Sequence, residues 1–102
     1  MTFRDTVTIG AATLSGITPE NRRATIAVDG PATAEVIREA CRWAFEDLGL
    51  HRVQAWLAAG DPAIAAYEAA GFMNEGTVRD KARRDGGWQD CVLLGLLAGE
   101  LA

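Results

Sequence analysis

The N-terminal part of the chain contains two stretches with the character of β-strands. Residues Thr6 to Leu14 alternate loosely between apolar and polar side chains and are rich in Thr, Val and Ile. Arg23 to Val28 has the same character. The intervening segment 15–21 contains Gly, Pro and Asn, which favour turns. We expect these two strands to form an antiparallel hairpin.

A helical periodicity follows over residues 32–48. One apolar stripe repeats at helical spacing and comprises Ile37, Cys41, Ala44 and Leu48. Pro31 suits the first helical position, because its missing N–H costs nothing there. Gly49 can adopt the left-handed conformation that ends many helices. The pattern predicts one long helix between these two residues.

The second half of the chain continues with a strand, a short helix and a hairpin. Residues 51–58 are almost continuously apolar after Gln54, which predicts a central strand covered on both faces. A short helix then runs to Gly71, with Asp61 as its N-cap and Pro62 at its first position. Strands at Phe72–Arg83 and Trp88–Leu97 follow, joined by a turn containing Asp85-Gly86.

The predicted order is therefore strand, strand, helix, strand, helix, strand, strand. This order indicates an α+β fold with a mixed sheet, built as a single domain over residues 1–102. The length suffices for one hydrophobic core, and the hydrophobic content of 49% supports a packed domain. We expect Trp43, Phe45, Val53, Leu57, Phe72 and Val92 to lie in the core or in an interface.

Charge and composition narrow the possible partners. The net charge of −4 argues against a nucleic-acid-binding protein, which needs a basic face. No apolar run is long enough to cross a bilayer, and the N-terminus lacks the basic-then-apolar order of a signal peptide. We therefore expect no membrane partner and a cytoplasmic location.

The cysteines and the single histidine do not indicate a metal site. Cys41 and Cys91 each lie among apolar neighbours, which favours two buried small side chains in a reducing compartment. The only histidine is His51, and the chain has no Cys-x-x-Cys pair. His51 follows a helix-ending Gly-Leu, which favours a structural role.

The segment from Ala44 to Asp90 resembles the GNAT N-acetyltransferases, especially the ribosomal-protein alanine acetyltransferase branch. The resemblance rests on AFEDLGLHRVQAW, on YEAAGF and on NEGTVRDKARRDGGWQD. It covers only the C-terminal two-thirds of that fold, since the first strand and its following helices have no counterpart. It implies a truncated GNAT-like fold with a splayed parallel pair, Ala24–Val28 and Arg52–Leu57, and a long C-terminal hairpin.

The resemblance implies acetyl-CoA as co-substrate, held between the splayed strands with its pyrophosphate at the N-terminus of the long helix. The implied cofactor-binding residues are Ala27, Val28, Gly30, Ala32 and Thr33. The family's Arg or Gln in this loop is absent, and Asp29 places a negative charge there. A simple strand-to-helix turn explains Gly30 and Ala32 equally well.

The resemblance also implies that Tyr67 is the general acid that protonates the leaving thiolate of CoA. The alternative is a tyrosine ring that packs on the sheet with its hydroxyl at the rim. Glu75 and Arg79 either line the acceptor side or form a solvated strand face. We expect Asp90 to pair with Arg79 across the hairpin.

Two functions follow from these observations. The first is an acetyl-CoA-dependent N-acetyltransferase in which a small-molecule or peptide amine attacks the thioester directly. The second is a non-catalytic GNAT remnant that acts as a dimeric interaction module or a CoA-binding module. A GNAT sheet without its front part exposes an edge and an apolar face, so we expect a homodimer.

Overall fold

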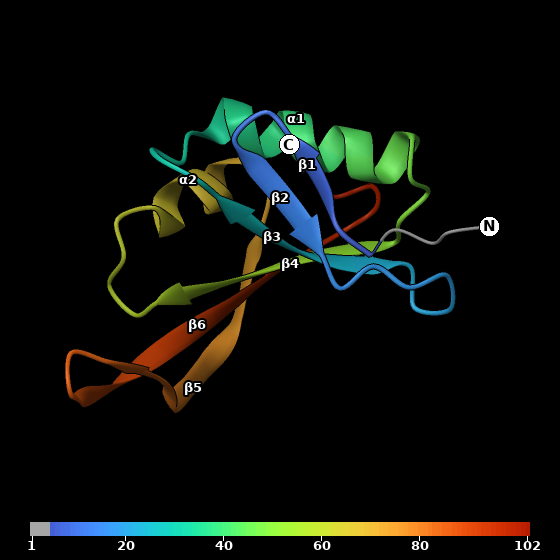
Figure 1. Cartoon of the computed structure of the whole chain (residues 1–102). Coiled ribbons are helices and arrows are strands. Elements are labelled where there is room, and N and C mark those ends of the chain that lie inside the picture. Colours follow the sequence, from blue (N-terminus) through green and yellow to red (C-terminus); the bar gives the residue numbers. More distant parts are fainter. Residues whose placement is uncertain (1–4) are drawn as a thin grey trace.

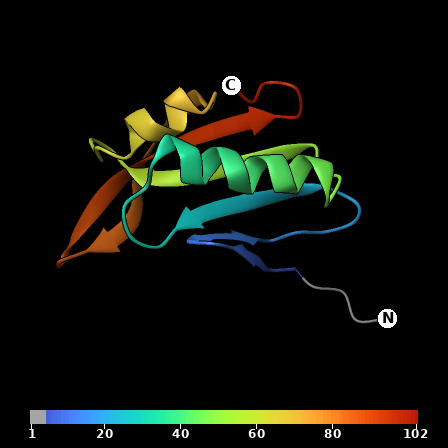
Figure 2. The same cartoon turned by 90° about the horizontal axis from the view of Figure 1, so that it is seen from above.

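The fold is a mixed six-stranded sheet with two helices on one of its faces (Figures 1 and 2). A computed structural model describes residues 5–102. The sheet order is β1-β2-β3-β4-β6-β5. The elements are β1 (Val7–Ile9), β2 (Ala12–Ser15), β3 (Arg23–Val28), α1 (Ala34–Glu46), β4 (Arg52–Ala58), α2 (Ile64–Ala69), β5 (Met73–Arg84) and β6 (Gly87–Leu97). The predicted fold class, a truncated GNAT-like mixed sheet, is confirmed.

The predicted single strand Thr6–Leu14 is wrong, because it forms two short strands. β1 and β2 pair antiparallel, with Ile9 opposite Ala12. Gly10 takes a positive φ of 59°, which allows the tight reversal between them. The inward positions change from odd numbers, Val7 and Ile9, to even numbers, Ala12 and Leu14, and the small Ala11 between them hides this change in the hydrophobic pattern. The chain therefore has one more strand than expected.

Helix α1 begins three residues later than the proline suggested. Thr33 is the N-cap: its side-chain oxygen accepts a hydrogen bond from the N–H of Val36. Pro31 therefore lies outside the helix, contrary to the prediction. Gly49 has a φ of 65°, in line with its predicted role after the C-terminal end. The buried stripe of α1 consists of Ile37, Ala40, Cys41 and Ala44.

Helix α2 is shorter than predicted and also begins later. The Asp61 carboxylate accepts a hydrogen bond from the N–H of Ala63 at 2.8 Å. Asp61 thus closes the turn that leads into α2, and Pro62 lies within that turn and not in the helix. The predicted short helix is present at the expected place in the sequence, and Tyr67 is its buried residue.

The core lies between the helices and the sheet. Its largest fully buried side chains are Tyr67, Leu14, Ile37, Leu94, Leu96, Val53 and Cys41. On β4, Val53 and Ala55 are buried, while Arg52 and Gln54 are half-buried on the other face. The expectation that this strand is covered on both faces is therefore wrong.

Most of the other residues expected in the core are buried or partly buried, but Trp43 is not. Phe72 and Val92 are buried, and Phe45 and Leu57 pack partly buried against the core. Trp43 is 38% exposed, so it does not belong to the core of this chain. Cys41 and Cys91 are both buried free thiols, as their apolar neighbours predicted.

The C-terminal hairpin extends away from the helices (Figure 1). Its two-residue turn has positive φ at both positions, 52° at Asp85 and 78° at Gly86. These angles match the type I′ turn that suits the twist of paired strands. The predicted hairpin is thus confirmed. None of the helices within residues 5–102 is both long enough and apolar enough to cross a membrane.

Candidate functional site

A gap opens in the sheet where the parallel strands β3 and β4 diverge. The two strands pair only from Arg23 opposite Arg52 to Thr25 opposite Gln54. Beyond that point β3 runs on to Val28 and β4 to Ala58 without pairing to each other. The splay expected of the parallel pair is therefore present.

A cavity of about 290 Å³ fills this gap. It is lined by Ile26, Ala27, Val28, Gly30, Ala32, Trp56, Leu57, Asp61, Ala63 and Tyr67. Neighbouring residues of a strand point to opposite faces, so Trp56 and Leu57 line the cavity from different sides of the sheet. The cavity therefore extends through the plane of the sheet, and its volume suits part of a small ligand.

Most of the predicted cofactor residues line this cavity. Ala27 and Val28 contribute from the free end of β3, and Gly30 and Ala32 from the loop that leads to α1. Gly30 has a φ of 86° and no atom within 4 Å of a β-carbon position, so backbone atoms are openly accessible there. Thr33 does not line the cavity, since its side chain caps α1.

Tyr67 lies on the helix side of the cavity. Its ring packs edge-on against Phe72, with centroids 5.3 Å apart and an interplanar angle of 89°. Within residues 5–102 the Tyr67 hydroxyl has no hydrogen-bond partner, and no side-chain oxygen there that is fully shielded from solvent lacks one. A hydroxyl that is neither bonded nor sealed is accessible from the cavity that the residue lines. The ring is packed as one expected reading requires, and the role of the hydroxyl as a general acid stays a prediction.

Burial lowers the acidity of that hydroxyl. Desolvation, with smaller contributions from Cys41 and Asp61, raises the pKa of Tyr67 to about 12. The phenol is protonated at neutral pH both with and without this shift, which makes it a weaker acid. A protonated phenol is the form needed to supply a proton to a leaving group.

The cavity suits the amide-containing arm of CoA better than it suits the negatively charged phosphates. Alternate backbone groups of β3 beyond Thr25 point into the gap without a strand partner, which suits an amide-containing arm. Among the lining residues the only charged side chain is that of Asp61. Asp29 precedes the cavity-lining Gly30, and Glu35 lies in the first turn of α1. Backbone N–H groups alone would therefore have to bind the phosphates.

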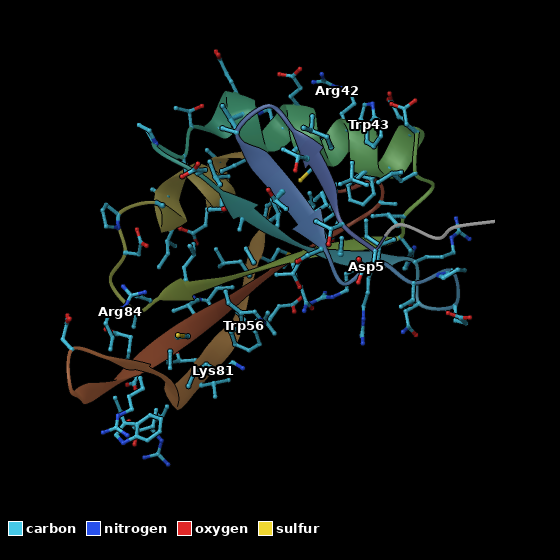
Figure 3. The ribbon with its side chains drawn as sticks, in the orientation of Figure 1. Asp5, Arg42, Trp43, Trp56, Lys81 and Arg84 are labelled. Carbon is cyan, nitrogen blue, oxygen red and sulfur yellow. The ribbon has the colours of Figure 1, made fainter. Side chains whose placement is uncertain are left out.

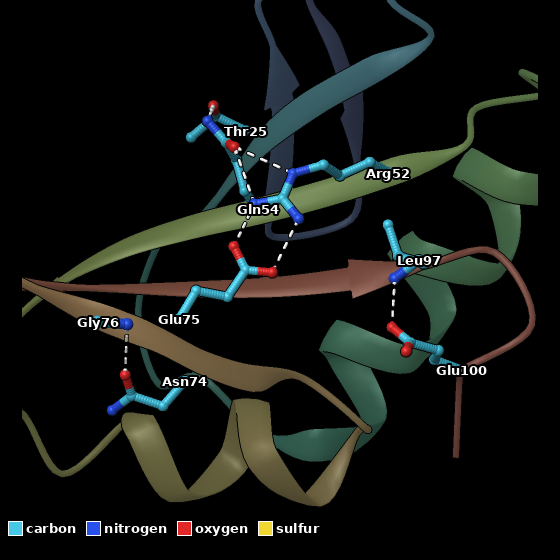
Figure 4. Close-up of polar contacts among 8 residues, drawn as sticks. All are labelled: Thr25, Arg52, Gln54, Asn74, Glu75, Gly76, Leu97 and Glu100. Atoms are coloured by element: carbon cyan, nitrogen blue, oxygen red, sulfur yellow. Dashed lines mark hydrogen bonds and ion pairs between the residues drawn. The ribbon is translucent and has the colours of Figure 1, made fainter.

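A polar network occupies the helix-free face at the point where the strands diverge (Figure 4). Arg52 donates to both carboxylate oxygens of Glu75, at 2.9 and 2.6 Å. Arg52 also donates to Gln54, whose amide donates to the hydroxyl of Thr25. The Arg52 hydrogen bond is the main cause that holds the pKa of Glu75 below its usual range. The network joins β3, β4 and β5 across one face of the sheet.

Sequence reasoning missed a second contact on that face. The Lys81 ammonium lies 4.7 Å from the ring centroid of Trp56, and both side chains lie on the side of the sheet away from α1 (Figure 3). Lys81 lies within a register shift of β5 between Val78 and Ala82. A bulge removes simple alternation, so the pattern gave no signal for this contact.

Asp90 on the hairpin has a different partner from the one that the sequence predicted. The Asp90 carboxylate accepts the backbone N–H of Asp80 at 2.9 Å. In the described part of the chain Arg79 forms no ion pair, so the expected Arg79–Asp90 pair is wrong. Within residues 5–102 no group of three or more His, Cys, Asp or Glu side chains is arranged to hold a metal ion.

The chain is similar in structure to several solved acetyltransferases. The complex of spermidine N-acetyltransferase from Vibrio cholerae with CoA and spermine superposes with a TM-score of 0.80 at 26% identity, covering 87% of this chain. A mutant form of the spermidine/spermine N-acetyltransferase SpeG from the same organism gives 0.79 and 26% over 84%. A probable acetyltransferase gives 0.69 and 33% over 84%.

These similarities cover only part of the longer proteins. This chain spans 57% of each of the two Vibrio cholerae proteins and 53% of the probable acetyltransferase. No protein-family model and no curated protein matches the sequence. The divergent parallel pair and the superpositions together show that the chain has the GNAT acetyltransferase fold, over the portion that it shares with these enzymes.

Proposed function

We propose that this chain is an acetyl-CoA-dependent N-acetyltransferase that acts on an amine. The observation that carries the proposal is the protonated Tyr67 hydroxyl beside a cavity in the divergent β3–β4 pair. The fold of CoA-binding acetyltransferases supports it, since one of the superposed structures is a complex with CoA and spermine. The acceptor is a small-molecule amine, as in that complex, or the N-terminal amine of a peptide, as the resemblance to the ribosomal-protein alanine acetyltransferase branch implies.

In this mechanism the neutral amine of the acceptor attacks the carbonyl carbon of the thioester. The C–N bond forms, the C–S bond breaks, and the sulfur leaves as a thiolate. Tyr67 donates its phenolic proton to that thiolate, and the proton released by the new amide nitrogen returns to the phenolate or to water. β3 holds the substrate arm through its unpaired backbone groups, and Gly30 leaves the adjoining loop backbone open to phosphate.

A non-catalytic CoA-binding or interaction module is the second candidate. Its interaction form, which binds no CoA, is favoured by the absence of a cation among the lining residues and by the acidic Asp29 beside Gly30. Both features weaken phosphate binding at a helix N-terminus. The second candidate predicts that the protein transfers no acetyl group even when an amine is present.

We also propose that the chain forms a homodimer. β5 is an edge strand, and exposed large apolar side chains on it include Met73 at 60% and Val78 at 42%. A long edge strand with such side chains favours pairing with another copy. Light scattering that shows a monomer at micromolar concentration would contradict this proposal.

Two measurements test the enzymatic proposal. Calorimetry with acetyl-CoA tests binding, and release of free CoA thiol in the presence of spermine or an alanyl peptide tests transfer. Tyr67→Phe keeps the ring and removes only the hydroxyl, so we expect turnover to fall by about 10²-fold or more with little change in CoA affinity. Gly30→Val, in contrast, should weaken binding. Binding without transfer to any amine would support the non-catalytic module instead.

A further inference from the structure

On the helix-free face, the indole ring of Trp56 borders the cavity and the ammonium group of Lys81 lies beside that ring. Trp56 lines the cavity, and it shares the helix-free face of β4 with Arg52 and Gln54. The Lys81 ammonium lies 4.7 Å from the Trp56 ring centroid. Lys81 does not line the cavity itself, but its ammonium group contacts the ring of Trp56, which does.

The backbone of β5 fixes Lys81 in this place. The register shift between Val78 and Ala82 contains Asp80, which has a positive φ of 51°. The Asp90 carboxylate on β6 holds that conformation through the Asp80 N–H at 2.9 Å. The bulge interrupts the regular alternation of β5, and together with this hydrogen bond it directs the Lys81 side chain toward Trp56.

The charges on the two sides of the cavity differ. On the helix-free face Arg52 is neutralised by Glu75, whereas Lys81 forms no ion pair within the described residues. Three further cations, Arg79, Arg83 and Arg84, lie on the same part of β5, and they are likewise outside any ion pair there. On the α2 side the lining includes the Asp61 carboxylate. The same segment also carries Asp80, Asp85 and Asp90, so the charge that the structure places beside Trp56 is that of Lys81, while the α2 side carries the charge of Asp61.

We propose that Lys81, held against Trp56, determines acceptor specificity by disfavouring polycationic amines and favouring a primary amine linked to a nearby carboxylate. The acceptor binds with its ammonium group toward Asp61 and its carboxylate toward Lys81, because each charge then meets its opposite. The ammonium group loses a proton to water before the neutral amine attacks the thioester. The proposal rests on the proposed transferase function and deepens it, since it names the acceptor class. A free amino acid and the N-terminus of an acidic peptide both carry this chemistry.

The test uses binding as well as turnover. The probes are three tripeptide amides of sequence Ala-Glu-Glu, Ala-Gln-Gln and Ala-Lys-Lys, together with free glutamate and spermine. Affinity is read from the shift of the Trp56 indole N–H resonance, assigned with a Trp56→Phe variant. For the wild type we expect Ala-Glu-Glu to bind roughly three- to tenfold more tightly than Ala-Lys-Lys, the range of an exposed charge pair. Comparison of Ala-Glu-Glu with glutamate separates a peptide from a free amino acid.

Substitutions of Lys81 separate its charge from its packing. Lys81→Met keeps an unbranched side chain over Trp56 and should erase the ranking, whereas Lys81→Glu should reverse it. Arg42→Glu, on the solvent face of α1, changes the net charge equally and should leave the ranking intact. An unchanged ranking in Lys81→Glu, tighter binding of spermine than of Ala-Glu-Glu, or no Trp56 shift with any probe would overturn the proposal. Acetyl transfer from acetyl-CoA is measured separately, so a correct binding ranking without transfer rejects only the enzymatic proposal.

Discussion

Gly95 lies directly beneath the carboxylate of Glu75 on the helix-free face of the sheet. A β-carbon at residue 95 would collide with Oε2 of Glu75 and approach Nη1 of Arg52 at 2.7 Å. The missing side chain on β6 thus lets the ion pair between β4 and β5 pass over the strand that separates them.

Gly95 and Glu75 are therefore expected to be energetically coupled. Alanine at residue 95 must displace the Glu75 carboxylate in the native protein, but it displaces nothing in a Glu75→Ala background. Gly95→Ala should consequently be less unfavourable in that background by about 0.5–1 kcal/mol of unfolding free energy. Urea denaturation of the four proteins of the cycle measures this difference. Equal effects in both backgrounds would show that the two residues are independent.

The same ion pair predicts a loss of stability in acid. The hydrogen bond from Arg52 lowers the pKa of Glu75 in the folded protein, so the unfolded chain takes up this proton first as the pH falls. The stabilising contribution is present above the unfolded pKa and is lost as the pH falls through the folded one. Glu75→Gln should make the acidic limb of a stability–pH curve shallower. Glu20→Gln, in an exposed turn, is the matched control.

Tyr67 predicts a loss of stability in alkali. Burial raises its pKa from 10.0 to about 12, so its contribution is complete below pH 10.0 and is lost as the pH rises toward about 12. Tyr67→Phe should reduce the loss in that window. The thiol of Cys41 also has a pKa raised by burial, from 9.0 to about 12, and Cys41→Ala separates its share. Identical alkaline curves for wild type and Tyr67→Phe would contradict the buried phenol.

Phe72 should be the most informative core position at the start of β5. Its side chain is 4% exposed and packs edge-on against Tyr67. Truncation removes this contact and leaves a cavity, so Phe72→Ala should cost about 3–5 kcal/mol of unfolding free energy. Thermal denaturation gives the measurement, and an unchanged melting temperature would mean that the side chain is not in the core.

Removal of the acidic charge beside Gly30 should tighten CoA binding. Asp29 is exposed immediately before the loop that would hold the phosphates, and its charge opposes an anion near the helix N-terminus. Asp29→Asn should strengthen CoA affinity by roughly two- to fivefold at low salt. Calorimetry at two salt concentrations tests this, with the effect expected to shrink at the higher one. Weaker binding by the variant would show that Asp29 assists the ligand.

Local signals allowed the C-terminal hairpin and helix α1 to be predicted. Asp85-Gly86 specifies its own turn through the backbone conformations these residues tolerate, and the periodic stripe through Ile37 and Cys41 specifies the buried face of α1. Gly10 failed as a signal because Ala11 extends the apolar positions 7 and 9 by one step, so the change of register at Ala12 is not visible in the pattern. Pro31 misled because Thr33 supplies a better cap two residues later.

Residues of the candidate site could be predicted only where the family resemblance matched a family motif to positions of this sequence. It pointed to Gly30 and Tyr67, which both line the cavity. The contact between Lys81 and Trp56 depends on a bulge, and the contact between Arg52 and Glu75 depends on a glycine in the strand between them. Such contacts join strands that are distant in sequence, so no local pattern reveals them.

The short seam between β3 and β4 also has a consequence for local opening of the native state. Three residue pairs join these strands, whereas seven join β4 to β6. The sheet therefore has three strands on each side of this seam, and we expect the two sides to open as separate units. Amide hydrogens at the seam should exchange with solvent through a smaller opening than those of the β4–β6 ladder. A ligand in the gap contacts both units, so its binding should slow exchange at the seam before it changes exchange elsewhere.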